Sequence, residues 1–234
     1  MKSEDCWNTR KRFSHSIGKI FDVPVRIRYS VYLTLLISAG YSLIKNIDYS
    51  KPWTGLIDEG VSLLYTVAVF ASILLHEIGH ATVAVMLKRK VHEIIIYPFL
   101  GGTVFKQLKN LSPLNNILVV GAGPLTNFAI AGFLSRLRNI NFINAIVKVN
   151  TLIGSLNLLP FWPLDGGRIL ESILMLKGWS NTRINSVVLN SSRLSALGMG
   201  ITAFTNGDYL SMIFTVFLLI VAHVEFHNDK PSEK

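Results

Sequence analysis

The sequence is poor in cysteine and in charged residues. Cys6 is the only cysteine, which excludes an internal disulfide bond and with it a disulfide-stabilised secreted scaffold. Charged residues make up 16% of the chain, compared with roughly 25% in ordinary soluble domains. Hydrophobic residues make up 50% of the 234 positions. The composition therefore indicates a membrane protein.

Acidic residues are the scarcer charge, because 14 Asp and Glu stand against 23 Lys and Arg, a formal net charge of +9. The sequence has no aromatic-rich basic groove and no nucleic-acid-binding module, so nucleic acid is not an expected partner. It also lacks a signal-peptide core of about 7 to 15 apolar residues near the N-terminus, so we expect that end to stay attached. The positive charge is better explained by topology and contact with anionic lipids.

Six apolar runs follow one another along the chain. The six runs cover about 30–44, 61–87, 116–134, 142–159, 186–204 and 209–224. The first run is short, and the fifth contains many polar residues. The second run is about 40 Å long as a helix, enough to cross a hydrocarbon core of about 30 Å even when tilted. The sequence predicts an all-α membrane protein, a six-span helical bundle with a small membrane-associated β-hairpin or sheet.

Basic residues are distributed unevenly around the first two runs. Those before the first run or after the second are Lys2, Arg10, Lys11, Arg12, Lys19, Arg26, Arg28, Lys88, Arg89, Lys90, Lys106 and Lys109. The connection at 46–60 holds one Lys and three acidic residues. Because Lys and Arg remain on the cytoplasmic side, we expect both termini to be cytoplasmic. Only Arg136 and Arg138 oppose this arrangement.

Two local patterns precede the first run. A set of apolar residues shares one helical face, which predicts a short interfacial helix or otherwise a disordered tail; it comprises Phe13, Ile17, Ile20 and Phe21. Residues 23–28 then alternate between apolar and polar, which predicts a strand.

The second run contains His76-Glu77-Ile78-Gly79-His80. On a helix, His76 and His80 project from the same face, so both imidazoles can bind one Zn²⁺. Glu77 is then placed to take a proton from metal-bound water. An ionisable group in a membrane-spanning helix costs several kcal/mol unless it is paired or bound. The alternative is that the three side chains satisfy one another in a soluble core.

A catalytic zinc site needs a third protein ligand and an open position. Asp165 is the best candidate, because it follows a proline-broken stretch at the end of the fourth run and precedes Gly166-Gly167. The fourth run returns to the cytoplasmic side, where the histidines are expected. An Asp before two glycines otherwise makes a simple turn. Competing ligands by residue type are His92, Glu93, Glu171, His223 and His227.

These motifs resemble the site-2 protease family of intramembrane zinc metalloproteases, in the branch of the bacterial sporulation factor protease. The resemblance rests on residues 76–80, on Asn157 through Gly167 with its N-x-x-P and L-D-G pattern, and on segments 99–102 and 121–127. It implies one zinc ion bound by His76, His80 and Asp165, and Glu77 as general base. It places Asn157 near the scissile carbonyl, where its amide would donate to the oxyanion. Asn157 could instead join two helices.

The resemblance also implies hydrolysis of peptide bonds in or near transmembrane segments, in a multi-pass protein of the bacterial cell (inner) membrane. The expected organisation is a cytoplasmic basic segment with a strand (1–28), an intramembrane metalloprotease domain (29–226) and a polar tail (227–234). Relatives often carry a PDZ or CBS domain, and neither is expected here. The expected partners are a membrane-protein substrate, the bilayer and an unidentified regulator.

Substrate presentation is predicted for residues 91–97, whose β-branched residues indicate a strand before a re-entrant turn. An edge strand there would hold an unwound substrate by strand addition. The alternative is a hairpin that pairs with residues 23–28. Three rival functions are a transporter, an inactive membrane chaperone of the same fold and a soluble zincin; the first two do not require the complete motif, and the apolar runs exclude the third.

Overall fold

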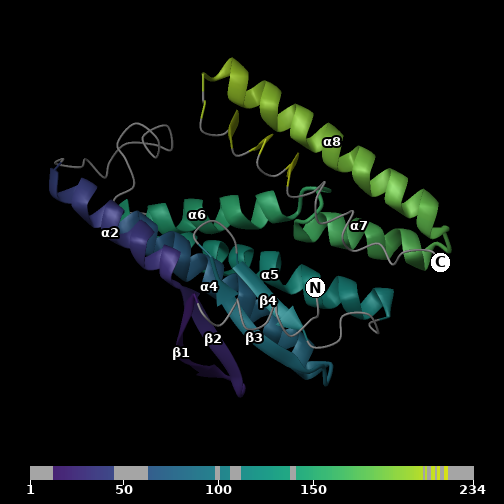
Figure 1. Ribbon diagram of the computed structural model, residues 1–234, viewed down its shortest axis with the longest axis horizontal. Coiled ribbons are helices and arrows are strands. Elements are labelled where there is room, and N and C mark those ends of the chain that lie inside the picture. Colours follow the sequence, from purple (N-terminus) through teal and green to yellow (C-terminus); the bar gives the residue numbers. More distant parts are fainter. Residues whose placement is uncertain are drawn as a thin grey trace. The chain divides into compact units, whose positions relative to one another are not determined.

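The computed structural model describes residues 13–44, 63–97, 101–105, 112–137 and 141–207, and a few positions between 209 and 220 (Figure 1). The chain forms two compact units. Unit 1 comprises Met1–Asn110 and Leu125–Ile153, and unit 2 comprises Leu111–Pro124 and Gly154–Lys234. Helix α5 (Pro113–Leu134) and helix α6 (Asn141–Asn157) each run from one unit into the other.

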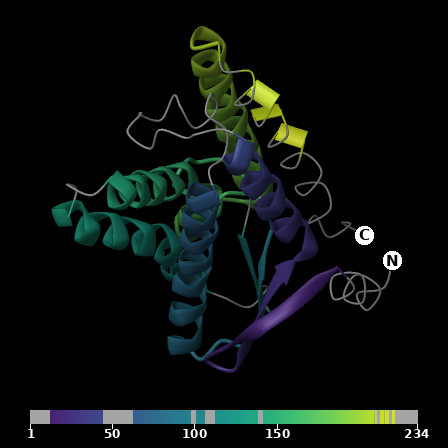
Figure 2. The same ribbon diagram turned by 90° about the vertical axis from the view of Figure 1, so that its left-hand side faces the viewer.

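A four-stranded sheet lies in unit 1, in the order β1-β2-β3-β4 (Figure 2). The strands are β1 (Ser14–Ile20), β2 (Val23–Arg28), β3 (Val91–Ile96) and β4 (Gly101–Phe105). β1 is antiparallel to β2 and β3 to β4, whereas β2 and β3 are parallel, with Val25 opposite Ile94. The strands predicted at 23–28 and 91–97 are confirmed. The re-entrant turn falls on 98–100, outside the described residues.

The predicted interfacial helix around residues 13–21 is wrong, because these residues form β1 and its turn. Phe21 and Asp22 both have positive φ, 51° and 61°. Two such residues make the tight turn whose twist matches a β-hairpin. Pairing with β2 satisfies the backbone groups, and Arg26 Nε donates to Ser14 Oγ at 2.9 Å. The helical spacing of the apolar side chains is therefore coincidental.

The parallel pair β2 and β3 requires a crossover connection. Helices α2 (Tyr29–Ile44) and α4 (Leu63–Met86) lie within it. One face of the sheet packs on α4, and the buried cluster joins Val23, Val25, Val31, Ile73, Ala81, Ile94 and Ile96. This packing holds the helix that carries the histidine motif against a rigid sheet.

β3 has a strand on each side, so the prediction that residues 91–97 form a free edge is wrong. The alternative pairing with residues 23–28 is present, although it is parallel and not a hairpin. Among the described strands, β1 and β4 form the edges of the sheet.

Unit 2 contains α7 (Asp165–Leu176) and α8 (Asn181–Thr205), which contact each other. Leu174, Ile184 and Val188 form a buried cluster between them. A second cluster joins Phe161 and Leu164 of the preceding loop to Ala196 of α8. The Trp162 backbone N–H donates to Ser192 Oγ at 2.9 Å. These contacts fix the loop that leads into Asp165.

Two helices among the described residues are long and apolar enough to cross a membrane, Tyr65–Met86 and Pro113–Leu137. α2 has 16 residues and α6 has 17, fewer than the roughly 20 that a span needs. α8 is 25 residues long but carries many polar side chains. The predicted helical class with a small sheet is confirmed, whereas the six-span count stays a prediction. The sixth run lies mostly outside the described residues.

Candidate metal centre

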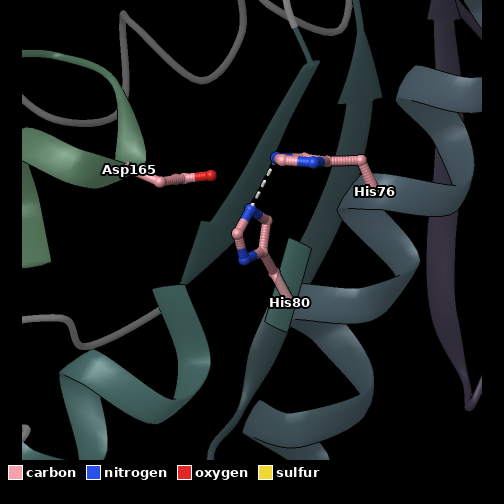
Figure 3. A group of neighbouring side chains, drawn as sticks. All are labelled: His76, His80 and Asp165. Carbon is pink, nitrogen blue, oxygen red and sulfur yellow. Dashed lines mark hydrogen bonds between the residues drawn. The ribbon is translucent and has the colours of Figure 1, made fainter. Parts of the chain in front are cut away.

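His76 and His80 lie on one face of α4 and their rings converge (Figure 3). The two Nε2 atoms are 3.1 Å apart, and the rings meet edge to face. Two nitrogens bound to one zinc at about 2.0–2.1 Å in tetrahedral geometry lie roughly 3.3–3.4 Å apart. Both side chains are buried, with 4% and 7% of their surface exposed. The pair therefore fits two ligand positions of a single metal ion.

The second nitrogen of His76 has a partner of its own. His76 Nδ1 lies 2.5 Å from Asn127 Oδ1 on α5. Asn127 Nδ2 donates to the Ser72 carbonyl at 3.3 Å and to Asn150 Oδ1 at 2.8 Å. A second nitrogen held in this way orients the imidazole and fixes its tautomer. This network lies entirely within unit 1 and connects α4, α5 and α6.

Glu77 follows His76 on α4 and is also buried, with 5% of its surface exposed. Its backbone position places it about 100° around the helix from His76. The predicted base thus lies in the same buried region of unit 1 as the two histidines.

Asp165, drawn with the histidines in Figure 3, belongs to unit 2 and is the first residue of α7. Its carboxylate is buried, with 8% of the residue exposed. A negative charge in the first turn of a helix is favoured by the helix dipole. Prolines and the packing of Phe161 end the chain's previous helix, so α7 begins at this aspartate.

The two glycines after Asp165 are explained by close backbone packing within unit 2. A Cβ on Gly166 would collide with the carbonyl oxygens of Leu158 and Leu159. A Cβ on Gly167 would lie 2.7 Å from the Phe161 carbonyl group. The Leu-Asp-Gly-Gly sequence is therefore more than a turn, because only glycine lets α7 begin so close to the loop.

Asn157 is the last residue of α6 and is half-buried. It lies in unit 2, seven residues before Leu164, the residue that directly precedes α7. The structure thus places Asn157 and Asp165 at the two ends of one short connection between α6 and α7.

The competing ligand candidates are placed elsewhere or lie outside the described residues. Glu93 is a buried residue of β3, and its carboxylate lies 4.0 Å from Arg26 Nε on β2. His92 is on the same strand, and Glu171 is on α7. His223 and His227 lie outside the described part of the chain.

Asn127 is the last residue of the 121–127 motif, but the sequence indicates no role for it, and no sequence motif includes Asn150 or Ser72. Asn127 lies 51 positions from His76, and Asn150 lies 78 positions from Ser72. The one available signal was two asparagines inside otherwise apolar runs, where polar groups need partners.

The fold and the convergent histidine pair define a helical metalloprotease scaffold, and comparison with known proteins agrees. Residues 64–138 and 134–199 match Peptidase family M50. These segments cover more than half of the chain, which therefore belongs to this family. The resemblance inferred from the sequence motifs is confirmed.

Two relatives indicate the breadth of the family. The chain is 27% identical over 222 residues to a zinc metalloprotease of Methanocaldococcus jannaschii, an alignment that covers 91% of this chain and 60% of the relative. It is 35% identical over 104 residues to stage IV sporulation protein FB of Bacillus subtilis, covering 42% of this chain and 36% of the relative. The chain thus spans about 60% of the first relative's length and less of the second.

The fold also resembles a solved structure, the site-2 protease from Methanocaldococcus jannaschii. The TM-score is 0.63 at 23% sequence identity, and the match covers 95% of this chain and 98% of that one. This similarity shows that the chain shares the fold of that structure.

Proposed function

We propose that the chain is an intramembrane zinc metalloprotease that hydrolyses peptide bonds in or near transmembrane segments of membrane proteins. The observation that carries the proposal is the pair of Nε2 atoms converging at 3.1 Å inside a helix long and apolar enough to cross a membrane. Membership of Peptidase family M50 and relatives named as zinc metalloproteases support it.

The proposed zinc ligands are His76, His80 and Asp165. All three are buried, and each offers one atom that can bind a metal ion. Two neutral imidazoles and one carboxylate are a ligand set typical of catalytic zinc, with one position left for water or substrate. The close packing at Gly166 and Gly167 supports a fixed position for the Asp165 backbone within its unit.

The proposed chemistry is divided between the metal ion and two side chains, Glu77 and Asn157. His76, His80 and Asp165 would hold the zinc ion, which when bound would act as a Lewis acid and lower the pKa of its bound water. Glu77 accepts the proton of the attacking water and passes it to the leaving amine. The Asn157 side-chain amide donates a hydrogen bond to the oxyanion of the substrate, a contribution of about 3 kcal/mol in comparable sites.

The substrate would present its backbone as an extended strand. Because β3 is flanked by β2 and β4, the proposed docking position moves to the outer edge of β4. Strand addition there uses main-chain hydrogen bonds, which do not depend on the substrate's sequence. A transmembrane helix must unwind first, so helix-breaking residues near the cleaved bond should favour cleavage.

For the whole chain we propose a multi-pass protein with six spans and cytoplasmic termini, in the bacterial cell membrane. The basic segment 1–28, the protease domain 29–226 and the tail 227–234 are its proposed parts. The two apolar helices and the basic residues near the ends of the first two runs support this arrangement.

Glu77→Gln tests the division of labour at the metal. If Glu77 is the base, the variant should lose cleavage and keep the zinc content of the parent, because glutamine fills the same space and cannot take the proton. His80→Ala and Asp165→Ala should lower both. Zinc is measured on purified protein, and cleavage by comparing membrane-protein N-termini in cells that carry each variant.

Glu171→Gln provides the matched control, since it makes the same substitution on α7. It should retain both zinc and cleavage. Equal zinc loss in Glu77→Gln would make Glu77 a ligand. A parent protein without zinc and without new N-termini would contradict the proposed function.

A further inference from the structure

Asn127 contacts the proposed ligand His76 on the side away from the metal position. We propose that Asn127 is a positioning residue, which holds His76 in the tautomer whose lone pair is on Nε2, the nitrogen that would bind zinc. The inference rests on the proposed function, because it takes His76 as a ligand. It deepens that function by naming what sets the ligand's orientation.

The first step concerns the proton on His76. A neutral imidazole carries one N–H, and its location is decided by the partner of each nitrogen. Nδ1 lies 2.5 Å from Asn127 Oδ1, an acceptor, so the N–H is on Nδ1. Nε2 then carries the lone pair and lies 3.1 Å from Nε2 of His80. This is the arrangement a metal ligand needs.

The second step concerns the orientation of the Asn127 amide. Turned over, it would present its NH₂ group to His76 Nδ1 and favour the opposite tautomer. The contacts of Asn127 Nδ2 prevent this, because it donates to the backbone carbonyl of Ser72, which can only accept. Reversal would bring two oxygens together in a buried site and leave both acceptors without a donor, which is unfavourable.

The third step fixes Asn150, the other partner of Asn127 Nδ2. Asn150 Nδ2 donates to the Ile146 carbonyl at 3.0 Å and to Ser72 Oγ at 2.9 Å. Its oxygen must therefore face Asn127. Two backbone carbonyls thus determine which way both side-chain amides are turned. The amide of Asn127 in turn determines which nitrogen of His76 carries the proton.

The side chains of this network are buried, and its members come from three helices and all lie in unit 1. Ser72 and His76 are one turn apart on α4, Asn127 is on α5 and Asn150 is on α6. Fully satisfied buried networks are rigid. The ligand orientation is therefore built into the helix packing before any metal binds.

Zinc affinity of variants of the full chain in detergent tests this inference. Asn127→Leu removes the acceptor at similar volume and should weaken zinc binding tenfold to a hundredfold, the usual effect of losing such a partner. Asn127→Asp keeps an oxygen for His76 Nδ1–H and should recover most of the affinity, although it disturbs the contacts to Ser72 and Asn150. Co²⁺ substitution should show an altered visible spectrum for the leucine variant only.

Asn116→Leu is the matched control on the same helix, because Asn116 Nδ2 donates to Ser172 Oγ at 2.8 Å in unit 2. It loses a similar hydrogen bond and should bind zinc like the parent. Parent-like affinity and spectrum in Asn127→Leu would overturn the inference. So would equal weakening in Asn116→Leu, or an aspartate variant as weak as the leucine variant, since either indicates a structural role. A parent that binds no zinc would instead overturn the proposed function.

Discussion

Two residues of the candidate site are held by different physical means. His76 is oriented through its side chain, by an amide whose polarity is fixed by backbone carbonyls. Asp165 is placed through its backbone, because the next two residues pack where no Cβ fits. A ligand held through side-chain contacts is sensitive to polar substitutions, whereas one held through backbone packing is sensitive to added volume.

Gly166→Ala should therefore destabilise unit 2 by about 1–3 kcal/mol or more, the usual cost of overpacking, and should lower zinc content. The added methyl group collides with backbone oxygens, which cannot move aside as a flexible side chain can. Thermal unfolding in detergent and zinc analysis measure the two effects.

Gly198→Ala is the control, because it makes the same change in α8 where nothing lies within 4 Å of the new atom. It should stabilise the helix by roughly 0.5–1 kcal/mol through lower backbone entropy of the unfolded chain. Equal thermal unfolding midpoints for Gly166→Ala and Gly198→Ala would contradict the packing argument.

The residues of the site were predictable to different degrees. His76, Glu77 and His80 follow from helical spacing within five positions. Asp165 required a long-range argument from topology. The roles of all four residues stay predictions. The Asn127–Asn150–Ser72 network was out of reach, because its partners lie 23 to 78 positions apart and meet only when three helices pack.

The order of the strands determines which edges are open to the proposed extended substrate. β2 and β3 form the buried centre, because their alternating residues pack on α4. Local periodicity predicted both strands but not their neighbours, since pairing order depends on crossovers and turns. β1 was missed because the Phe21-Asp22 turn lacks the glycine that usually signals a tight hairpin. Ile95→Pro would thus disrupt the central sheet and cannot test an edge.

A peptide that spans a cleavage site tests strand addition at the edge of β4. An N-methyl group removes one backbone donor, and in a strand only alternate N–H groups face the neighbouring strand. N-methylation should therefore impair cleavage at every second position, with the intervening positions as controls. If N-methylation impaired cleavage equally at every position, or at none, strand addition would be contradicted. The proposed zinc chemistry would be unaffected.

The orientation of the chain in the membrane decides from which side the proposed substrate is supplied. His80 lies six residues before α4 ends at Met86, about 9 Å along the helix. The motif is therefore nearer the end of α4 that leads through Lys88, Arg89 and Lys90 into β3. If basic residues mark the cytoplasmic side, the sheet and the metal site are both nearer the cytoplasm.

Single cysteines in a Cys6→Ser background test this orientation. Cysteines at Lys11, Lys90 and Lys230 should resist an impermeant thiol reagent in intact cells, because those positions are expected in the cytoplasm. A cysteine at Ser50, in the connection with one Lys and three acidic residues, should be labelled. All four should react once the membrane is permeabilised, which controls for burial. Labelling of position 90 in intact cells would reverse the orientation and place the metal site toward the outer face, so that substrates would be cleaved from outside the cell.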